Sequence, residues 1–401
     1  MQRMPRQEDR ERTVTGGSSM KNNAKNKVKS IVRITEIRLH NFKNTVFGTI
    51  TVPSRSNIVG IYGQNGSGKT AVVEALDVVQ RLLTREGLRD VPIKDYIRQG
   101  ENRCSIRVCF QVELEDEKQK RIRYAVTYDV VFHRGENGRW KKKESMQLDK
   151  VAHEKHKADI IDALLEFFFS NLSVEKAPDP FVDIPETVSV PDYHLLNHFF
   201  CIANAILSRM IPGLSLGIRH FEEKTDQNGE KRIRIEPLSE RDGIVIPLHC
   251  ESEGILNLVG LLFSLVRVYN DPSACLVVDN LDAGISEYLL GELVAAFGDF
   301  GKGQLIFTSH NLRPMEMLPN ENIVLTTANP RNRYIRMQSD FVNRNTRDMY
   351  IRALTLGGQQ EKLNEESAAY ELDDGFHSAW KCKPDCTLSA SSEYHDCLHT
   401  G

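Results

Sequence analysis

The stretch Gly63-Gln64-Asn65-Gly66-Ser67-Gly68-Lys69-Thr70 fits the pattern G-x-x-x-x-G-K-[ST] at every fixed position. Residues 57–62 before it are apolar and partly β-branched, which predicts a buried parallel strand. Residues 71–79 after it have the broad apolar face of a helix. Such a turn aims its N–H groups and the positive end of the helix dipole at an anion. The stretch therefore predicts a site for the phosphates of a nucleoside triphosphate.

Each residue type in this loop has a task. The glycines let the backbone curl around the β-phosphate, Lys69 can reach the β- and γ-phosphates, and the Thr70 hydroxyl can bind Mg²⁺. Glycine-rich turns also close strand–helix units that bind nothing, but the full pattern in this context favours a ligand. The residues that we expect to bind ATP here are Gly63, Asn65, Gly66, Ser67, Gly68, Lys69 and Thr70.

The bulk composition is that of a soluble intracellular protein. The 401 residues are 27% charged and 40% hydrophobic, with a net charge of −3. The protein as a whole has no positive charge that would attract nucleic acid, so contact with nucleic acid would need a local basic patch. Eight cysteines without a pairing rhythm are typical of reduced cytosolic thiols. No apolar run has membrane-spanning length, and the basic N-terminus has no signal-peptide core. We expect a cytoplasmic protein that does not bind membranes.

Composition shifts suggest four segments. Residues 1–29 carry eight Lys/Arg and three acids, a net of +5, and favour a disordered tail over a nucleic-acid-binding arm. Met20 is an alternative start. Residues 30–345 are expected to form the main domain, with an insert at about 135–215. Residues 346–380 read as helical and residues 381–401 as a loose tail.

Alternating and apolar patterns predict the order of elements. Strands are expected at 31–39, 46–52, 103–110, 121–132, 216–219 and 231–235. Helices are expected at 159–172, 195–210 and 255–269, and the proline-rich segment 174–191 reads as irregular.

Two further strands carry chemistry at their carboxyl ends. The apolar residues 275–278 end in Asp279, which would hold magnesium beside Thr70. Residues 304–308, one helix later, predict a parallel neighbour that leads to His310. His310 can hydrogen-bond a γ-phosphate or orient the attacking water. The competing interpretations are a buried strand that happens to end in Asp and a satisfied loop histidine.

A third turn precedes the apolar helix at 255–269. Ser252 suits an N-cap, and Gly254 permits close backbone approach, so the helix N-terminus can face an anion. Taken alone, this turn is only that of a well-capped core helix.

The order of these motifs resembles that of ABC-type ATPase heads, and within them the RecF/SMC/OLD branch. Residues 34–44 are similar to that branch's first strand and turn, and residues 63–70 to its P-loop. Residues 345–350 and 356–361 resemble stand-alone bacterial "AAA family" ATPases, many associated with phage defence. The resemblance covers roughly residues 30–380. It implies an α/β, ABC-type P-loop head with a mixed sheet, an antiparallel β subdomain and an inserted helical region. The roughly 180 residues after the P-loop lack long heptads, so no long coiled coil is expected.

The resemblance also implies partners and further site residues. Two copies would pair head to tail around two ATP molecules, each between Lys69 of one subunit and Ser252-Glu253-Gly254 of the other. A glutamine after the P-loop helix would contact magnesium, and Gln99 is the nearest candidate. No TOPRIM-type acidic cluster follows Asp279, so a nuclease or other effector would be a separate chain. DNA or RNA is a possible partner.

One position departs from the family. The residue after Asp279 is usually Glu, the base that activates water, and here it is Asn280. An amide accepts no proton at neutral pH. Asp282 could substitute only if the loop bends toward the water. We therefore expect slow hydrolysis and a dimer switch in a regulatory or sensor subunit. The alternatives are an ATP-binding scaffold without turnover and a RecF-like DNA-repair protein.

Two further patterns could form binding sites, but each also has a simpler structural interpretation. Cys382, Cys386, His395, Cys397 and His399 could hold zinc, but the spacing is irregular and favours a tail. The run Arg139-Trp140-Lys141-Lys142-Lys143 could touch a phosphate backbone, although a solvated hairpin edge is favoured.

Overall fold

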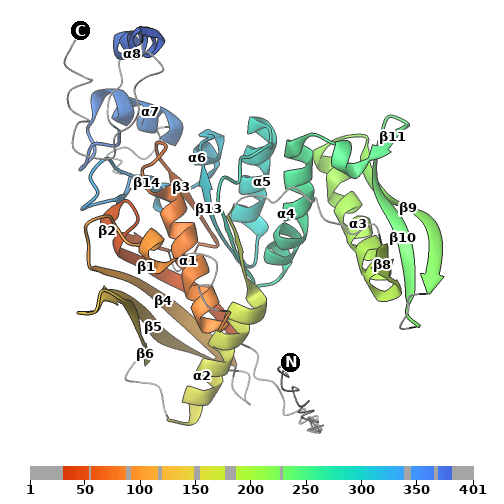
Figure 1. Ribbon diagram of the computed structural model, residues 1–401, viewed down its shortest axis with the longest axis horizontal. Helices are drawn as coiled ribbons and strands as arrows, with labels where there is room; N and C mark the ends of the chain where they lie inside the picture. The colour runs from red at the N-terminus through yellow and green to blue at the C-terminus, as the bar shows by residue number, and fades with distance from the viewer. Residues whose placement is uncertain are drawn as a thin grey trace, which may run out of the picture.

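The computed structural model describes residues 30–53, 56–86, 92–115, 120–148, 154–176, 187–225, 229–337, 345–364 and 369–381. The basic tail, Met20 and the cysteines and histidines after position 381 lie outside these residues. Within these described residues, the strands form three sheets with helices between them (Figure 1). This is the expected α/β architecture, with a mixed sheet and an antiparallel β subdomain.

The central sheet positions the predicted phosphate loop. Its strands run in the order β15-β14-β3-β13-β12-β7, and all neighbours are parallel except β14 and β15. The predicted parallel pairing of β12 with β13 is confirmed. The strand bounds are β3 Ile58–Tyr62, β7 Leu172–Glu175, β12 Cys275–Val278, β13 Gln304–Ser309, β14 Ile323–Thr326 and β15 Tyr334–Arg336. Every residue of β3 is buried, as its continuous apolar run predicts.

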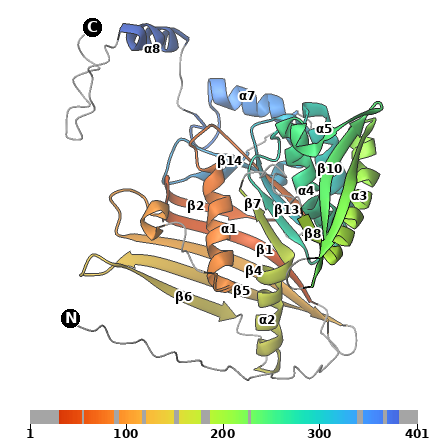
Figure 2. The same cartoon turned by 45° about the vertical axis from the view of Figure 1, so that its right-hand side comes forward.

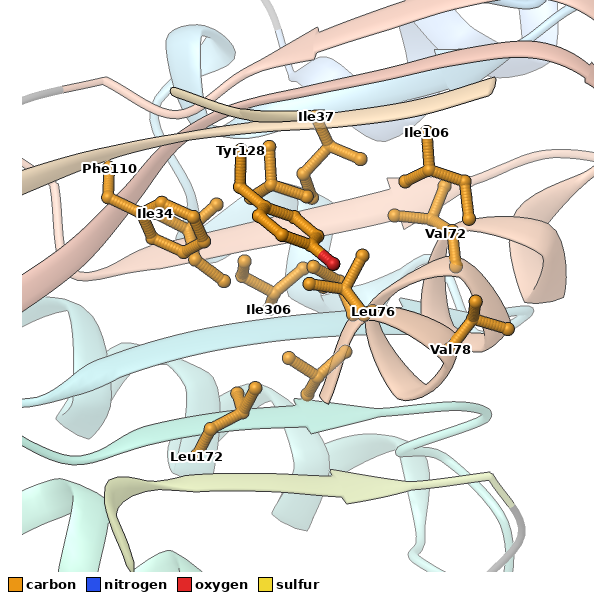
Figure 3. Packing of buried hydrophobic residues seen from close by; sticks show 14 of the residues in the cluster. Ile34, Ile37, Val72, Leu76, Val78, Ile106, Phe110, Tyr128, Leu172 and Ile306 are labelled. Carbon is orange, nitrogen blue, oxygen red and sulfur yellow. The ribbon is translucent and has the colours of Figure 1, made fainter. Parts of the chain in front are cut away.

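Helix α1, Lys69–Leu83, lies between the central sheet and a five-stranded antiparallel sheet (Figure 2). The strand order of this second sheet is β2-β1-β4-β5-β6. The bounds are β1 Ser30–Phe42, β2 Thr45–Thr51, β4 Arg103–Glu115, β5 Arg121–Arg134 and β6 Trp140–Leu148. Figure 3 shows the resulting core, in which Val72 and Leu76 of α1 lie among side chains from both sheets. The loop that starts α1 therefore leads into a helix whose apolar face is packed between the two sheets.

The third sheet leads directly into the turn at Ser252. Strand β10, Lys231–Arg241, pairs with β9, Leu214–Thr225, with β8, Thr187–Ser189, and with β11, Ile244–Pro247. Helix α3, Val190–Met210, packs on this sheet, and α4, Glu253–Asn270, follows β11 through a short 3-10 turn, Leu248–Cys250. Ser239 Oγ donates to Glu251 Oε1 over 2.7 Å, which ties the sheet to the start of α4.

The remaining helices complete the chain. They are α2 Glu154–Glu166, α5 Glu287–Phe300, α6 Arg313–Met317, α7 Thr346–Leu356 and α8 Ala369–Lys381, with short helical turns at Ile93–Tyr96, Phe167–Asn171 and Asn320–Asn322. At 21 residues, α3 is the longest helix in the described part of the chain, in agreement with the expected lack of a long coiled coil. None of the described helices is both long and apolar enough to span a bilayer.

Some local expectations were wrong. The predicted helix at 159–172 begins at Glu154 and ends in a π-helical turn, and Leu172 already belongs to β7. The segment 174–191, read as irregular, contributes the end of β7, all of β8 and the start of α3. Parallel pairing with β12, which no local pattern reveals, makes Leu172–Glu175 a strand.

Candidate nucleotide-binding site

The phosphate loop connects β3 to α1 and has the backbone that its glycines permit. Gly66 has φ 73° and Gly68 φ 97°, a left-handed region in which side chains are strained. A Cβ on Gly63 would lie 1.7 Å from Thr326 Oγ1, so no larger residue fits there. Ser67 Oγ lies 2.5 Å from the same Thr326 hydroxyl. The loop is thus fixed against β14.

A cavity of about 450 Å³ opens over this loop, within the size range of small-ligand sites. It brings together residues from the loop, from the turn after β1, and from the ends of β12 and β13. The lining residues are Lys43, Asn44, Asn65, Gly66, Gly68, Lys69, Thr70, Ala71, Glu74, Asn280 and His310. Asn280 and His310, more than 200 residues from the loop in sequence, therefore face the same space as Lys69.

Lys69 is poised at the floor of the cavity. Its side chain is buried, and Nζ donates to the carbonyl oxygens of Gly63 over 2.7 Å and of Gln64 over 2.8 Å. Burial lowers the pKa of Lys69, while the carboxylates of Asp279 and Asp282 oppose that shift. A phosphate would offer this ammonium group a stronger, charged acceptor than the two carbonyls.

Asp279 follows β12 and is almost fully buried, with 3% of its surface exposed. Thr308 Oγ1, on β13, donates to Asp279 Oδ1 over 2.5 Å, which fixes the carboxylate. The carboxylate of Asp279 and the hydroxyl of Thr70 are the hard oxygen ligands that Mg²⁺ prefers. These two residue types fit a magnesium ion, whose remaining positions water and phosphate would fill.

Asn280 has a left-handed backbone, with φ 54°, which asparagine tolerates better than most residues. Its N–H donates to Thr308 Oγ1 over 2.8 Å, so Thr308 holds both Asp279 and the residue after it. Asn280 lines the cavity, at the position where the resemblance implies a glutamate. An amide there can hydrogen-bond a water molecule but cannot take its proton.

Asp282 faces the backbone rather than the cavity. Its Oδ2 accepts hydrogen bonds from the N–H groups of His310, at 3.0 Å, and Asn311, at 2.9 Å. It is not among the residues that line the cavity. The bending of the loop that would make Asp282 a base would break both hydrogen bonds.

His310 is an exposed residue directly after β13 and lines the cavity. Burial and the positive charge of Lys69 lower its pKa from the usual 6.5, and the carboxylates of Asp282 and Asp279 partly oppose them. The ring is therefore neutral at pH 7 and can accept or donate one hydrogen bond.

Four residues that the sequence analysis assigned to the site, Ser252, Glu253, Gly254 and Gln99, lie outside the cavity. Ser252 and Glu253 are exposed at the start of α4, and neither these residues nor Gly254 line the cavity. This placement is the one that a turn serving another subunit's cavity would have, and that role stays a prediction. Gln99 is exposed in a turn and does not line the cavity either, so its contact with magnesium also stays a prediction.

The sequence motifs missed an ion pair at the cavity wall. Lys43 Nζ lies 2.5 Å from the carboxylate of Glu74, which is on α1 one turn after Thr70. The neighbouring Asn44 side chain donates to the Gly66 carbonyl of the phosphate loop. Lys43 and Asn44 occur in the turn that carries the family resemblance, but no pattern joins Lys43 to Glu74, 31 residues away.

Comparisons with known proteins give a matching family model and two similar curated proteins. The family model "RecF/RecN/SMC N terminal domain" matches residues 33–332. Over 74 residues the chain is 36% identical to the DNA replication and repair protein RecF of two Rickettsia bellii strains, OSU 85-389 and RML369-C. That segment is 18% of this chain and 18% of each relative.

Solved structures show the same fold at low identity. An SMC head bound to the C-winged helix domain of ScpA matches with TM-score 0.52 and 15% identity, over 77% of this chain and 98% of that one. An Smc head with an extended coiled coil, bound to the C-terminal domain of ScpA derived from Pyrococcus furiosus, matches with TM-score 0.50 and 13% identity, over 77% and 97%. Since the family model covers most of the chain and the fold agrees with it, the chain belongs to the RecF/RecN/SMC N-terminal domain family.

Proposed function

We propose that this protein is an ABC-type ATPase that binds ATP with magnesium, hydrolyses it slowly, and uses it to join two copies of the chain. The observation that carries the proposal is the cavity in which Lys69 and Thr70 face Asn280 and His310. In it, Lys69 would exchange the Gly63 and Gln64 carbonyls for phosphate oxygens, and His310 would hydrogen-bond the γ-phosphate. Bound magnesium would supply charge neutralisation at the β- and γ-phosphates, with Thr70 and Asp279 as its protein ligands.

Slow turnover follows from Asn280. A positioned general base contributes roughly 10²- to 10⁴-fold to a hydrolytic rate. Asn280 can orient the attacking water but cannot remove its proton, so most of that factor is missing. An ATP molecule that persists suits a protein whose nucleotide holds a dimer together. We place such a switch in the regulatory or sensor subunit of a bacterial defence or DNA-maintenance system, with the effector on a separate chain.

Single-turnover hydrolysis tests this function. With protein in excess of ATP, we expect the natural protein to hydrolyse far more slowly than ~1 s⁻¹, a typical lower bound for enzymes. Asn280→Glu should raise the rate by about 10²-fold, the lower range for a general base. Lys69→Ala should abolish nucleotide binding and serves as the control. Turnover by the natural protein at 1 s⁻¹ or faster, on the order of ordinary enzymes, would refute slow hydrolysis.

Asn280 also favours the second candidate, a scaffold that binds ATP without meaningful turnover. Phosphate release that Lys69→Ala abolishes would separate the enzyme from the scaffold. The third candidate, direct binding of DNA, has a weaker basis: Lys141, Lys142 and Lys143 are exposed on the edge strand β6. That candidate predicts ATP-dependent binding to DNA ends with a steep dependence on salt.

A further inference from the structure

A buried tyrosine binds the phosphate loop at its last glycine. Tyr334, the first residue of β15, donates its hydroxyl to the Gly68 carbonyl over 2.8 Å. Its ring lies against β2, because a Cβ on Gly48 would be 2.4 Å from Tyr334 Cδ2. The ring is therefore fixed beside β2, and its hydroxyl holds the residue that directly precedes Lys69.

The residue before this tyrosine reaches the same loop through Asn44. Arg333 is buried, and its Nη2 donates to the Asn44 carbonyl over 2.8 Å. The side chain of Asn44 in turn donates to the Gly66 carbonyl. Two consecutive residues, Arg333 and Tyr334, thus hold the phosphate loop at Gly66 and at Gly68, both of which line the cavity.

Arg333 is the last residue of the loop 327–333, which connects β14 to β15 and is attached to β2. The Pro330 carbonyl accepts hydrogen bonds from the N–H groups of Val46, over 2.7 Å, and Phe47, over 2.9 Å. The N–H of Arg333 donates back to the Phe47 carbonyl over 3.0 Å. These three backbone bonds join the loop to the start of β2.

A second attachment of this loop comes from the segment after α7. Glu361 accepts hydrogen bonds from Asn329 Nδ2 on Oε2, over 3.1 Å, and from Asn332 Nδ2 on Oε1, over 3.0 Å. The Lys362 carbonyl accepts from the N–H of Ala328 over 2.8 Å. Hydrogen bonds from Asn332 and Asn329 lower the pKa of Glu361, so its carboxylate is ionised at pH 7 and is a strong acceptor.

We propose that Glu361 is a positioning residue of the nucleotide site: it fixes the loop 327–333, so that Arg333 and Tyr334 hold the phosphate loop in the shape that binds phosphate. None of these three side chains lines the cavity, so they act through the phosphate loop and not by contact with the nucleotide. The inference rests on the proposed function, because it takes phosphate as the ligand of that loop. It also gives a role to residues 356–361, a stretch with a family resemblance but no place in the cavity.

Tyr334→Phe tests the contact with the phosphate loop. The ring stays and only the hydroxyl is lost, so we expect the Kd for ATP to rise about 3- to 10-fold, as the loss of one hydrogen bond allows. Tyr128→Phe is the matched control, because Tyr128 is also buried and donates to Glu144 over 2.7 Å, and neither residue lines the cavity. Urea unfolding should show similar losses of stability in the two variants. An unchanged Kd in Tyr334→Phe would overturn the proposal.

Glu361→Ala tests the attachment outside the cavity. It removes both acceptors, and we expect the Kd for ATP to rise about tenfold. Glu361→Gln keeps an oxygen for one asparagine and offers an N–H to the oxygen of the other, so its Kd should stay within about threefold of the natural protein's. Glu113→Ala is the control, because Glu113 also accepts from two side chains, those of Gln111 and Arg123, on the antiparallel sheet. Equal Kd values in Glu361→Ala and Glu113→Ala would contradict the positioning role.

Hydrogen exchange in the nucleotide-free protein separates this inference from the proposed function. The amides of Val46 and Phe47, which donate to the Pro330 carbonyl, should exchange faster in Glu361→Ala than in the natural protein. They should keep their protection in Glu361→Gln. Unchanged exchange in Glu361→Ala overturns the proposal whether or not the chain binds ATP. If the natural protein binds no ATP but this exchange pattern holds, the proposed function is wrong and the positioning of the loop by Glu361 stands.

Discussion

Single residues divide the cavity into a part that we expect to bind phosphate and a part without a general base. Lys69 and Thr70 come from the start of α1, and Lys43 from the turn after β1. The opposite side is lined by Asn280 and His310, which closely follow the ends of β12 and β13. His310 is the only one of this opposing pair that can change its charge. The pH dependence of ATP binding should therefore report on this side chain.

We predict that ATP binds more tightly as the pH falls, through His310. Burial and the positive charge of Lys69 lower the pKa of His310 from 6.5. A γ-phosphate beside the ring favours the charged imidazolium and raises that pKa, so binding takes up a proton. Affinity should then rise as the pH is lowered from about 8 to about 6, the range in which histidines titrate.

Calorimetric titrations of the natural protein and of His310→Gln check this prediction. Glutamine keeps a hydrogen-bond donor but does not titrate, so its residual pH dependence measures the protonation of ATP itself. The difference between the two proteins is the contribution of His310. Identical pH profiles would show that the ring does not contact the phosphate.

At the scale of elements, one side chain joins the two large sheets at a defect in β1. The pairing of β1 with β4 slips between Ile34 and Glu36. Gln304, the first residue of β13 and 2% exposed, satisfies the freed backbone: Ile34 N–H donates to its Oε1 over 2.9 Å, and its Nε2 donates to the Ile34 carbonyl over 2.8 Å. The antiparallel sheet is thus anchored to the strand that leads to His310.

We predict that Gln304→Leu destabilises the protein by about 2–4 kcal/mol. Leucine fills a similar volume but leaves one buried N–H and one buried carbonyl unpaired, each at a cost of about 1–3 kcal/mol. Gln111→Leu is the control, since Gln111 is half-buried on β4 and its side chain donates to Glu113 of the same strand rather than to a backbone group of another sheet. It should change the free energy of unfolding by less than about 0.5 kcal/mol. Urea unfolding measures both, and equal effects would contradict the anchoring role.

Elements with a strong local pattern could be predicted from the sequence, and those defined by distant pairing could not. The continuous apolar run of β3 and the crossover from β12 to β13 needed only local periodicity. Leu172–Glu175 carries a mixed pattern after a helix and becomes a strand only because β12 lies beside it. Likewise Asp279 and His310 follow from their strands, whereas the ion pair of Lys43 with Glu74 depends on how β1 and α1 pack.

On the scale of the whole molecule, the proposed function requires two separate surfaces of the described chain for one nucleotide. The cavity over the phosphate loop contains Lys69 but not Ser252, and the Ser252 turn is exposed at the N-terminus of α4, where the positive end of that helix's dipole faces outward. In the proposed head-to-tail dimer, one copy would present both halves of a site without joining them. A head-to-tail pair of copies would close two such sites, as in a cyclic dimer.

This arrangement predicts that two inactive variants restore each other. Lys69→Ala has a defective cavity and an intact turn, whereas Ser252→Arg has an intact cavity and a blocked turn. Each alone should hydrolyse almost no ATP, but in an equal mixture half of the dimers pair the two kinds, and each mixed dimer contains one intact site. At saturating ATP, the mixture should recover about a quarter of the natural protein's hydrolysis rate per chain, as random pairing of two-fold partners requires. A double variant carrying both changes, mixed with the natural chain, leaves every site of a mixed dimer defective and is the control. The mixture of single variants could instead stay inactive while Ser252→Arg still binds ATP. The turn at Ser252 would then not complete the cavity of a second copy, and the proposed head-to-tail dimer would be wrong.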